Sequence, residues 1–357
     1  MTTLLSRTLA GRAPGAGVTA VAIVALAFTT VLAARWNSSA PQTDHDTAVD
    51  RAADAVDRAR EQFDAGRYAE AVDTLTARVE HAPRDAAGYF WLGRARFELR
   101  DYAGAIAAFE RGVELNPDDS EYHRWLGRGY GEEADRKHSF SLAGRVRQQF
   151  EAAVRLGPAN IAARRDLLQF YLEAPWIVGG GNDKAHQQVN AIAAVDSTAG
   201  RFARAAYLMH RNDVSQAAIE YRAAVSARPA NLEWYFEAAE FFEKQGDARG
   251  LRAALDGAAS VDSTDPRLLY FRGITDVIAG VELSDAESLL QRYLAVPVRS
   301  DRPSRSSTHE WLGQLYERLG RVADAESEYR ISMALDPDHK SPRERLRRLA
   351  VHGESRP

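Results

Sequence analysis

The sequence predicts an all-α fold, an α-α superhelix (solenoid) of about eight helix–turn–helix repeats. The main observation is a fixed period: Tyr68 and Pro83 recur 34 residues later as Tyr102 and Pro117. Between these landmarks lie two short amphipathic helical patterns, and the proline that closes each unit cannot continue a helix. A unit of this length cannot bury its apolar face alone, so it must stack on its neighbours.

The composition supports a folded body and narrows the chemistry. The 357 residues are 45% hydrophobic and 27% charged. A net charge of −4 argues against nucleic acid as the main partner, because phosphate binding requires a basic surface. The chain has no cysteine, so disulfides and thiolate metal sites are excluded. The histidines show no metal-ligand spacing and no catalytic motif occurs, so we predict no metal, no cofactor and no catalytic residue.

The N-terminus carries a long apolar segment. Residues 1–14 are basic, and residues 15–35 contain no charge before Arg35. About twenty apolar residues can span a membrane as a helix, which predicts a transmembrane or signal-anchor helix over 15–35. A cleaved secretory signal is one alternative. The other is a segment that neither anchors the chain in a membrane nor serves as a cleaved signal. An anchor would hold an exported body at a bacterial cell envelope, whereas a cleaved signal would release it into the periplasm.

The remaining boundaries follow from composition and period. A polar, aperiodic stretch predicts a linker before the repeats, and a basic amphipathic pattern after Pro342 predicts a helix that covers the open end of the array. The predicted segments are a basic segment 1–14, an apolar helix 15–35, a linker 36–50, a repeat array 51–340, a capping helix 341–350 and a disordered tail 351–357.

The second unit carries the fullest set of landmarks. They are Tyr89, Leu92, Gly93, Tyr102, Ala105, Phe109, Gly112 and Pro117. This pattern resembles the tetratricopeptide repeat, and the resemblance extends over roughly residues 51–349. The resemblance implies that the first helix of each unit lines a concave side, on which such proteins bind segments of other proteins.

Two units depart from the period. The third and fourth units contain extra residues near 136–144 and 173–184, which we expect between the helices and on one side of the stack. The second insertion contains the apolar residues Trp176 and Ile177. They either pack back on the array or form a contact patch, and packing back is favoured because an exposed apolar run promotes association.

The family's register also predicts a binding groove on the concave side. Its residues in units two to four are Phe90, Arg94, Phe97, Arg124, Arg128 and Arg165. Arginine binds carboxylates through two parallel hydrogen bonds, so we predict that exposed phenylalanines and these arginines hold an acidic or C-terminal peptide segment. The alternative is a solvated face, on which the arginines pair with nearby acidic residues.

The resulting functional prediction is a non-enzymatic interaction scaffold or adaptor at the cell envelope. It would bind partner protein segments in the groove and contact the membrane through residues 15–35. One alternative is an enzyme whose site is built by the insertions in repeats three and four, which would show as polar groups with shifted pKa in a closed pocket. Another is a self-associating assembly factor, that is, a homo-oligomer.

Overall fold

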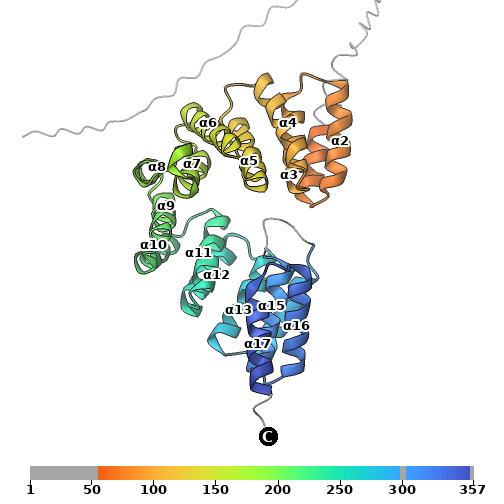
Figure 1. Ribbon diagram of the computed structural model, residues 1–357, viewed down its shortest axis with the longest axis vertical. Helices are drawn as coiled ribbons and strands as arrows, with labels where there is room; N and C mark the ends of the chain where they lie inside the picture. The colour runs from red at the N-terminus through yellow and green to blue at the C-terminus, as the bar shows by residue number, and fades with distance from the viewer. Residues whose placement is uncertain (1–54, 298–302, 354–357) are drawn as a thin grey trace, which may run out of the picture. The chain divides into compact units, whose positions relative to one another are not determined.

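The computed structural model describes residues 55–297 and 303–353, and all regular structure within them is helical (Figure 1). Residues 55–64 are helical, and the elements that follow are α2 (Tyr68–His81), α3 (Ala86–Glu98), α4 (Tyr102–Leu115), α5 (Ser120–Lys137), α6 (Phe140–Leu156), α7 (Ile161–Glu173), the short 3-10 helix η1 (Trp176–Val178), α8 (Asn182–Val195) and α9 (Ser197–His210). They continue with α10 (Val214–Ser226), α11 (Leu232–Lys244), α12 (Ala248–Val261), α13 (Arg267–Ala279), α14 (Leu283–Leu294), α15 (Arg305–Arg318), α16 (Val322–Leu335) and α17 (Lys340–Gly353).

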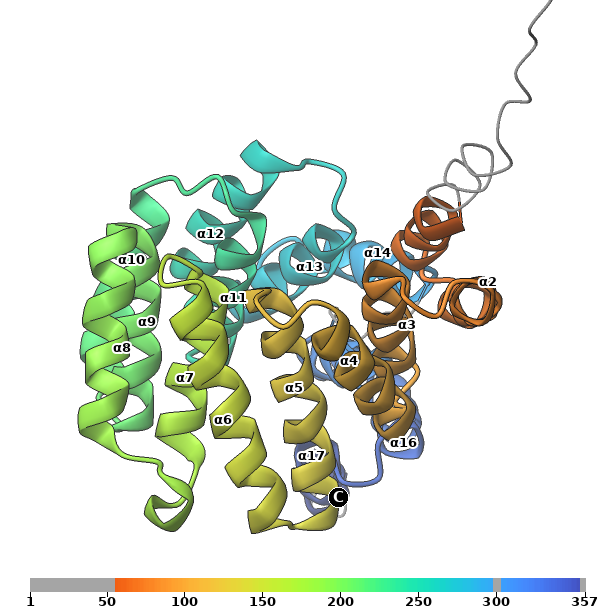
Figure 2. The ribbon, with the colours of Figure 1, turned by 90° about the horizontal axis from the view of Figure 1, so that it is seen from above.

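The helices form successive hairpins. From α3 to α16, each odd-numbered helix packs on the even-numbered helix that follows it, and each hairpin packs on the next. Figures 1 and 2 show these hairpins following one another along a curved path. This arrangement confirms the predicted all-α solenoid.

Polar residues at the hairpin turns start the helices. Asp85 and Asp101 stand before α3 and α4, and each accepts a hydrogen bond from a backbone N–H in the first turn. Asp119 does the same for α5 with two N–H groups. These donors have no partner within the helix, so an acidic N-cap stabilises each start.

Glycines allow the two helices of a hairpin to approach closely. A Cβ added at Gly93 of α3 would lie 2.5 Å from the Phe109 ring of α4. A Cβ at Gly127 of α5 would lie 2.6 Å from the Phe150 ring of α6. The aromatic ring of the second helix therefore occupies the space that a side chain on the first would need, which keeps the 34-residue motif closely packed.

The first insertion lengthens helices instead of forming a loop. We expected extra residues between the helices near 136–144, but α5 has 18 residues and α6 has 17, against 13 and 14 for α3 and α4. Only His138 and Ser139 separate α5 from α6. The side chains of Arg136 and Lys137 pair with Glu133 one turn earlier, which stabilises the added turn.

The second insertion, near 173–184, is a compact loop. It contains η1 and then Gly179, whose φ of 102° suits glycine. The Gly181 N–H donates to the Tyr171 carbonyl, and η1 packs against α6. These contacts hold the loop between α7 and α8 in one conformation.

The array ends in a helix that packs on the last hairpin. Helix α17 contacts α16, and its Leu346 and Leu349 pack against the core of the C-terminal hairpins. We predicted a disordered tail over 351–357, but α17 continues through Gly353, and residues 354–357 lie outside the described part. The apolar side chains of α17 explain why the helix stays docked.

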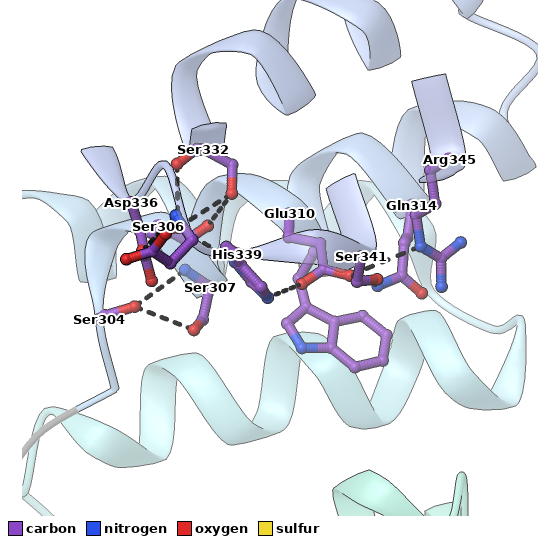
Figure 3. A network of polar contacts seen from close by, with 12 residues as sticks. Ser304, Ser306, Ser307, Glu310, Gln314, Ser332, Asp336, His339, Ser341 and Arg345 are labelled. Atoms are coloured by element: carbon purple, nitrogen blue, oxygen red, sulfur yellow. Dashed lines mark hydrogen bonds and ion pairs between the residues drawn. The ribbon is translucent and has the colours of Figure 1, made fainter. Parts of the chain in front are cut away.

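A buried polar network ties α17 to this hairpin (Figure 3). The Ser306 hydroxyl lies 3.0 Å from the Ser332 carbonyl oxygen and 3.2 Å from His339 Nδ1. His339 Nε2 lies 3.0 Å from the carboxylate of Glu310, which Arg345 also approaches. Ser306 and Ser332 are buried, so this serine–histidine–glutamate arrangement joins helices and is not an exposed nucleophile.

The predicted segments before the array lie outside the described residues. This applies to the basic segment 1–14, the apolar helix 15–35 and the linker 36–50. Within residues 55–297 and 303–353, no helix combines the length and apolarity needed to cross a membrane.

Candidate binding groove

Long-range hydrogen bonds identify the inner side of the curve. Arg165 of α7 contacts Glu237 of α11 at 2.5 Å, although the two residues are 72 positions apart. Trp311 of α15 donates from Nε1 to Glu243 of α11 at 2.7 Å. Helices two hairpins apart can meet only on the inside of a curve, so the odd-numbered helices line it. We call the inner surface that carries Arg94, Arg128, Arg165 and Glu237 the inner groove.

The two phenylalanines predicted to project into this groove pack between helices instead. Phe90 stacks on Tyr122 with ring centroids 4.6 Å apart and planes 7° apart. Phe97 meets the edges of Tyr102 and Trp125 at 5.4 and 5.6 Å. Both phenylalanines are half-buried. Their rings stabilise the junction of units two and three, and their role as apolar anchors for a bound segment stays a prediction.

Two of the predicted arginines stack on one aromatic ring. The Arg94 guanidinium carbon lies 4.1 Å from the Trp125 ring centroid, and that of Arg128 lies 4.4 Å from it. Arg94 also lies 4.9 Å from the centroid of Phe63. Flat guanidinium groups bind aromatic faces through the negative charge of the π surface, so Trp125 stabilises both cations.

Neither of these arginines makes an ion pair with a described residue, and Arg94 Nε is buried without a hydrogen-bond partner. Burial lowers the pKa of Arg94 to about 10, even though Glu98 raises it. Burial also lowers the pKa of Arg128, with Asp166 opposing the shift. Two partly desolvated cations whose guanidinium groups lack a described carboxylate partner are suited to binding an anionic group.

The other two predicted arginines already have partners. Arg124 donates from Nε to Asp166 at 2.8 Å and from Nη1 to Glu121 at 3.0 Å. Arg165 pairs with Glu237. The structure therefore divides the predicted set: Arg94 and Arg128 present guanidinium groups without a described acidic partner, and Arg124 and Arg165 are neutralised within the chain.

A pocket of about 310 Å³ adjoins Arg128. Its polar lining includes Glu132 and Asp166, and its apolar wall includes Phe150, Phe170 and other residues of α6 and α7. Burial raises the pKa of the Asp166 carboxyl, although Arg124 and Arg128 oppose that shift. The pocket is thus a mixed polar and apolar recess beside the arginine pair, with a volume at the lower end of small-molecule sites.

The groove becomes acidic further along. Burial raises the pKa of Glu240 and of Glu243 in α11, and Lys244 opposes both shifts. Glu243 also accepts hydrogen bonds from Tyr270 and Trp311, which lower its pKa. The inner groove therefore carries the arginine pair at α3 and α5 and partly buried carboxylates at α11.

The apolar loop residues do not pack back. Trp176 is 84% exposed and Ile177 is 68% exposed, while Val178 packs against the core. Phe140, at the start of the neighbouring α6, is 65% exposed. The expectation that Trp176 and Ile177 would pack on the array was wrong, since both side chains of η1 are mostly exposed.

Sequence reasoning missed two functional features of the groove. Trp125 lies in the first helix of the third unit, and only its place three residues before Arg128 hints at their contact. Glu237 contacts Arg165 across two hairpins, which no local pattern encodes. Among the residues that the structure describes, no group of three histidine or acidic side chains could hold a metal ion.

Comparison with protein families identifies the tetratricopeptide repeat in residues 56–120, 93–128 and 282–339. No curated protein matches the sequence. A human IFIT1 dimer with m7Gppp-AAAA has a similar structure, with a TM-score of 0.52 and 16% identity over 83% of this chain and 71% of that one. The APC/C hetero-tetramer Cut9-Hcn1 gives a TM-score of 0.51 and 14% identity over 80% of this chain and 53% of that one.

A thermophilic TPR protein of Thermus thermophilus aligns over 54% of this chain and 98% of its own, with 17% identity and a TM-score of 0.45. At these identities the two matches with TM-scores above 0.5 show the fold alone. The sequence match identifies the repeat at both ends of the array, and the intervening hairpins continue the same helical solenoid. The chain therefore carries tetratricopeptide repeats over residues 56–128 and 282–339.

Proposed function

We propose that this protein is a non-enzymatic interaction scaffold whose inner groove binds an extended, acidic segment of a partner protein. Tetratricopeptide-repeat proteins generally bind other proteins or peptides. The observation that carries the proposal is the pair Arg94 and Arg128, held on Trp125 without a described carboxylate partner. A carboxylate from a partner would supply the missing counter-charge, and the recess beside Arg128 would take a neighbouring side chain.

An enzymatic role receives less support from the same site. The recess does contain groups with shifted pKa, as the enzyme alternative requires. However, the hydrogen bond from Arg124 to Asp166 at 2.8 Å opposes the raised pKa of Asp166 and so weakens this carboxylate as a general base. We therefore assign the polar groups of the recess to binding.

The test uses fluorescence polarisation of a labelled poly-glutamate peptide with the full chain. We expect Arg94→Gln and Arg128→Gln each to weaken binding by about tenfold or more, because each removes a partly buried cation. Arg347→Gln is the matched control: it removes the same charge from the exposed face of α17. Equal affinities for all three variants would refute the groove. A capped oligonucleotide that binds more tightly than the peptide would refute a protein partner.

We also propose that the array is exported and held at a cell envelope by residues 15–35, or released into the periplasm after cleavage there. The support is the uncharged apolar segment between Arg12 and Arg35. Reporter fusions after residue 50 measure the side of the membrane on which the array lies. N-terminal sequencing of the mature protein separates an anchor from a cleaved signal.

Self-association is a second candidate function, favoured by the exposed Trp176 and Ile177. An exposed tryptophan at a fixed loop is the type of residue that dominates protein interfaces. A homo-oligomer that buries this loop would dissociate in a Trp176→Ser, Ile177→Ser variant. Sedimentation velocity over a range of concentrations measures this, and an unchanged distribution would remove the candidate.

A further inference from the structure

The ion pair of Arg165 and Glu237 crosses the inner groove. Arg165 Nη2 lies 2.5 Å from Glu237 Oε2, and Tyr221 donates a hydrogen bond to the other carboxylate oxygen at 3.4 Å. The two side chains are 28% and 25% exposed, so the pair is partly screened from water. It joins α7 to α11 and passes the intervening hairpin of α9 and α10.

The carboxylate of this pair also lines two recesses. Glu237 lines a pocket of about 590 Å³ together with Arg124, Arg165 and Trp234. Glu237 lines another pocket, of about 330 Å³, with residues of α7, α9 and α11. Because the same carboxylate belongs to both linings, it forms part of the boundary between them. Moving it away from Arg165 would join the two recesses into a longer trough.

We propose that Arg165 is a second, latent carboxylate-binding subsite of the groove, closed in the free protein by Glu237. The ligand is a carboxylate of the same acidic partner segment, so this inference rests on the proposed function. The intramolecular carboxylate occupies the position that the partner's carboxylate would take. Binding at Arg94 and Arg128 brings further acidic side chains of the segment close to Arg165, where they compete with Glu237.

The geometry allows a carboxylate of the partner to replace Glu237 at Arg165. Glu237 keeps the Tyr221 hydroxyl as a partner when Arg165 leaves, so its carboxylate is not left without a hydrogen bond. Arg124, by contrast, donates to two carboxylates, those of Asp166 and Glu121. A carboxylate of the partner would have to displace both. Among the predicted groove arginines with acidic partners, Arg165 is the one held by a single carboxylate from a distant helix.

The experiment compares two isosteric changes in the full chain. Glu237→Gln removes the competing charge, and we expect it to bind a labelled poly-glutamate peptide about fivefold more tightly than the wild type. Glu240→Gln is the control, because it removes a charge from the same helix at a carboxylate that makes no ion pair with a described residue. We expect it to increase the affinity for the peptide by less. Adding Arg165→Gln to Glu237→Gln should abolish the gain. Circular dichroism checks that each variant is folded.

The outcomes separate this inference from the proposed function. Equal affinities of the Glu237→Gln and Glu240→Gln variants, together with weakened binding by Arg94→Gln, would support the groove and overturn the latent subsite. A gain from Glu237→Gln that depends on Arg165, without any effect of Arg94→Gln, would support the subsite and overturn the arginine pair as the anchor. No binding by any variant would overturn both.

Discussion

At the scale of single residues, the environment of each arginine decides its role. Arg124 and Arg165 follow the ordinary rule for surface cations and pair with carboxylates. Arg94 and Arg128 instead stack on Trp125, and burial lowers their pKa. The sequence predicted all four at the groove with one role. The structure divides them because, among these four arginines, only the first two form ion pairs with described carboxylates, which lie on α5, α7 and α11.

The closely packed glycines of the repeat give a direct test of hairpin packing. In α5, Gly127→Ala would place a methyl group 2.6 Å from the Phe150 ring. We expect it to lower the free energy of unfolding by about 1–3 kcal/mol. Gly131→Ala, in the same helix, meets no atom within 4 Å and should be neutral or stabilising by up to about 1 kcal/mol. Urea unfolding of both variants, followed by circular dichroism, measures the difference; equal effects would contradict the packing argument.

The buried Glu133 predicts an acid-dependent loss of stability. Hydrogen bonds from Arg136 and Lys137 lower its pKa to about 2 from an ordinary value of 4.5. A lowered pKa in the folded state means that the stabilisation is complete above the unfolded pKa and is lost as the pH falls from about 4.5 toward 2. We expect Glu133→Gln to lack this part of the acid dependence. Urea unfolding at several pH values down to about 3 tests this; a gap between wild type and variant that stays constant on acidification would contradict it.

At the scale of elements, the 34-residue period predicted the hairpins because each landmark has a local cause, such as Gly93 against Phe109. The period did not reveal where extra residues would go. Added residues fit equally well into longer helices or into a loop. For the insertion near 136–144, the ion pairs with Glu133 favour a longer helix. For the insertion near 173–184, Pro175 and the glycines after it favour a loop. The exposure of Trp176 depends on this loop geometry, which periodicity does not determine.

The capping helix gives a prediction at the same scale. Leu346→Ala with Leu349→Ala removes the apolar side of α17 that packs on the C-terminal core. We expect this pair of changes to destabilise the last hairpin by about 2–4 kcal/mol. Arg347→Ala with Arg348→Ala changes only the exposed face and is the matched control. Hydrogen exchange of α15 and α16 should increase in the leucine variant alone; unchanged exchange there would show that α17 does not cap the array.

At the scale of the whole array, α11 connects hairpins that are not neighbours. A repeat array is usually held together by contacts between adjacent units alone. Here α11 also accepts the long-range contacts of Arg165 from α7 and Trp311 from α15. These two contacts fix the spacing of α7, α11 and α15 along the inner side. They could not be predicted from the sequence, because they depend on the curvature that all the intervening hairpins create together.

The bond from Trp311 to Glu243 therefore predicts the behaviour of the array as a unit. Trp311→Phe keeps an aromatic ring but removes the N–H that donates to Glu243 at 2.7 Å, leaving Tyr270 as the remaining donor at 2.9 Å. We expect the distance between the α7–α8 hairpin and the α15–α16 hairpin to vary more, because one of the links across the inner side is lost. The chain has no cysteine, so two can be added for spin labels at exposed Asp183 and Glu344.

Pulsed electron paramagnetic resonance then measures the distance distribution between α8 and α17. A broader distribution in Trp311→Phe than in the wild type would show that α11 restrains the curvature. Trp176→Phe is the control, because its exposed ring lies on the loop after α7 and makes no bond to α11. If Trp311→Phe and Trp176→Phe give the same distribution as the wild type, contacts between adjacent hairpins are sufficient to hold the array.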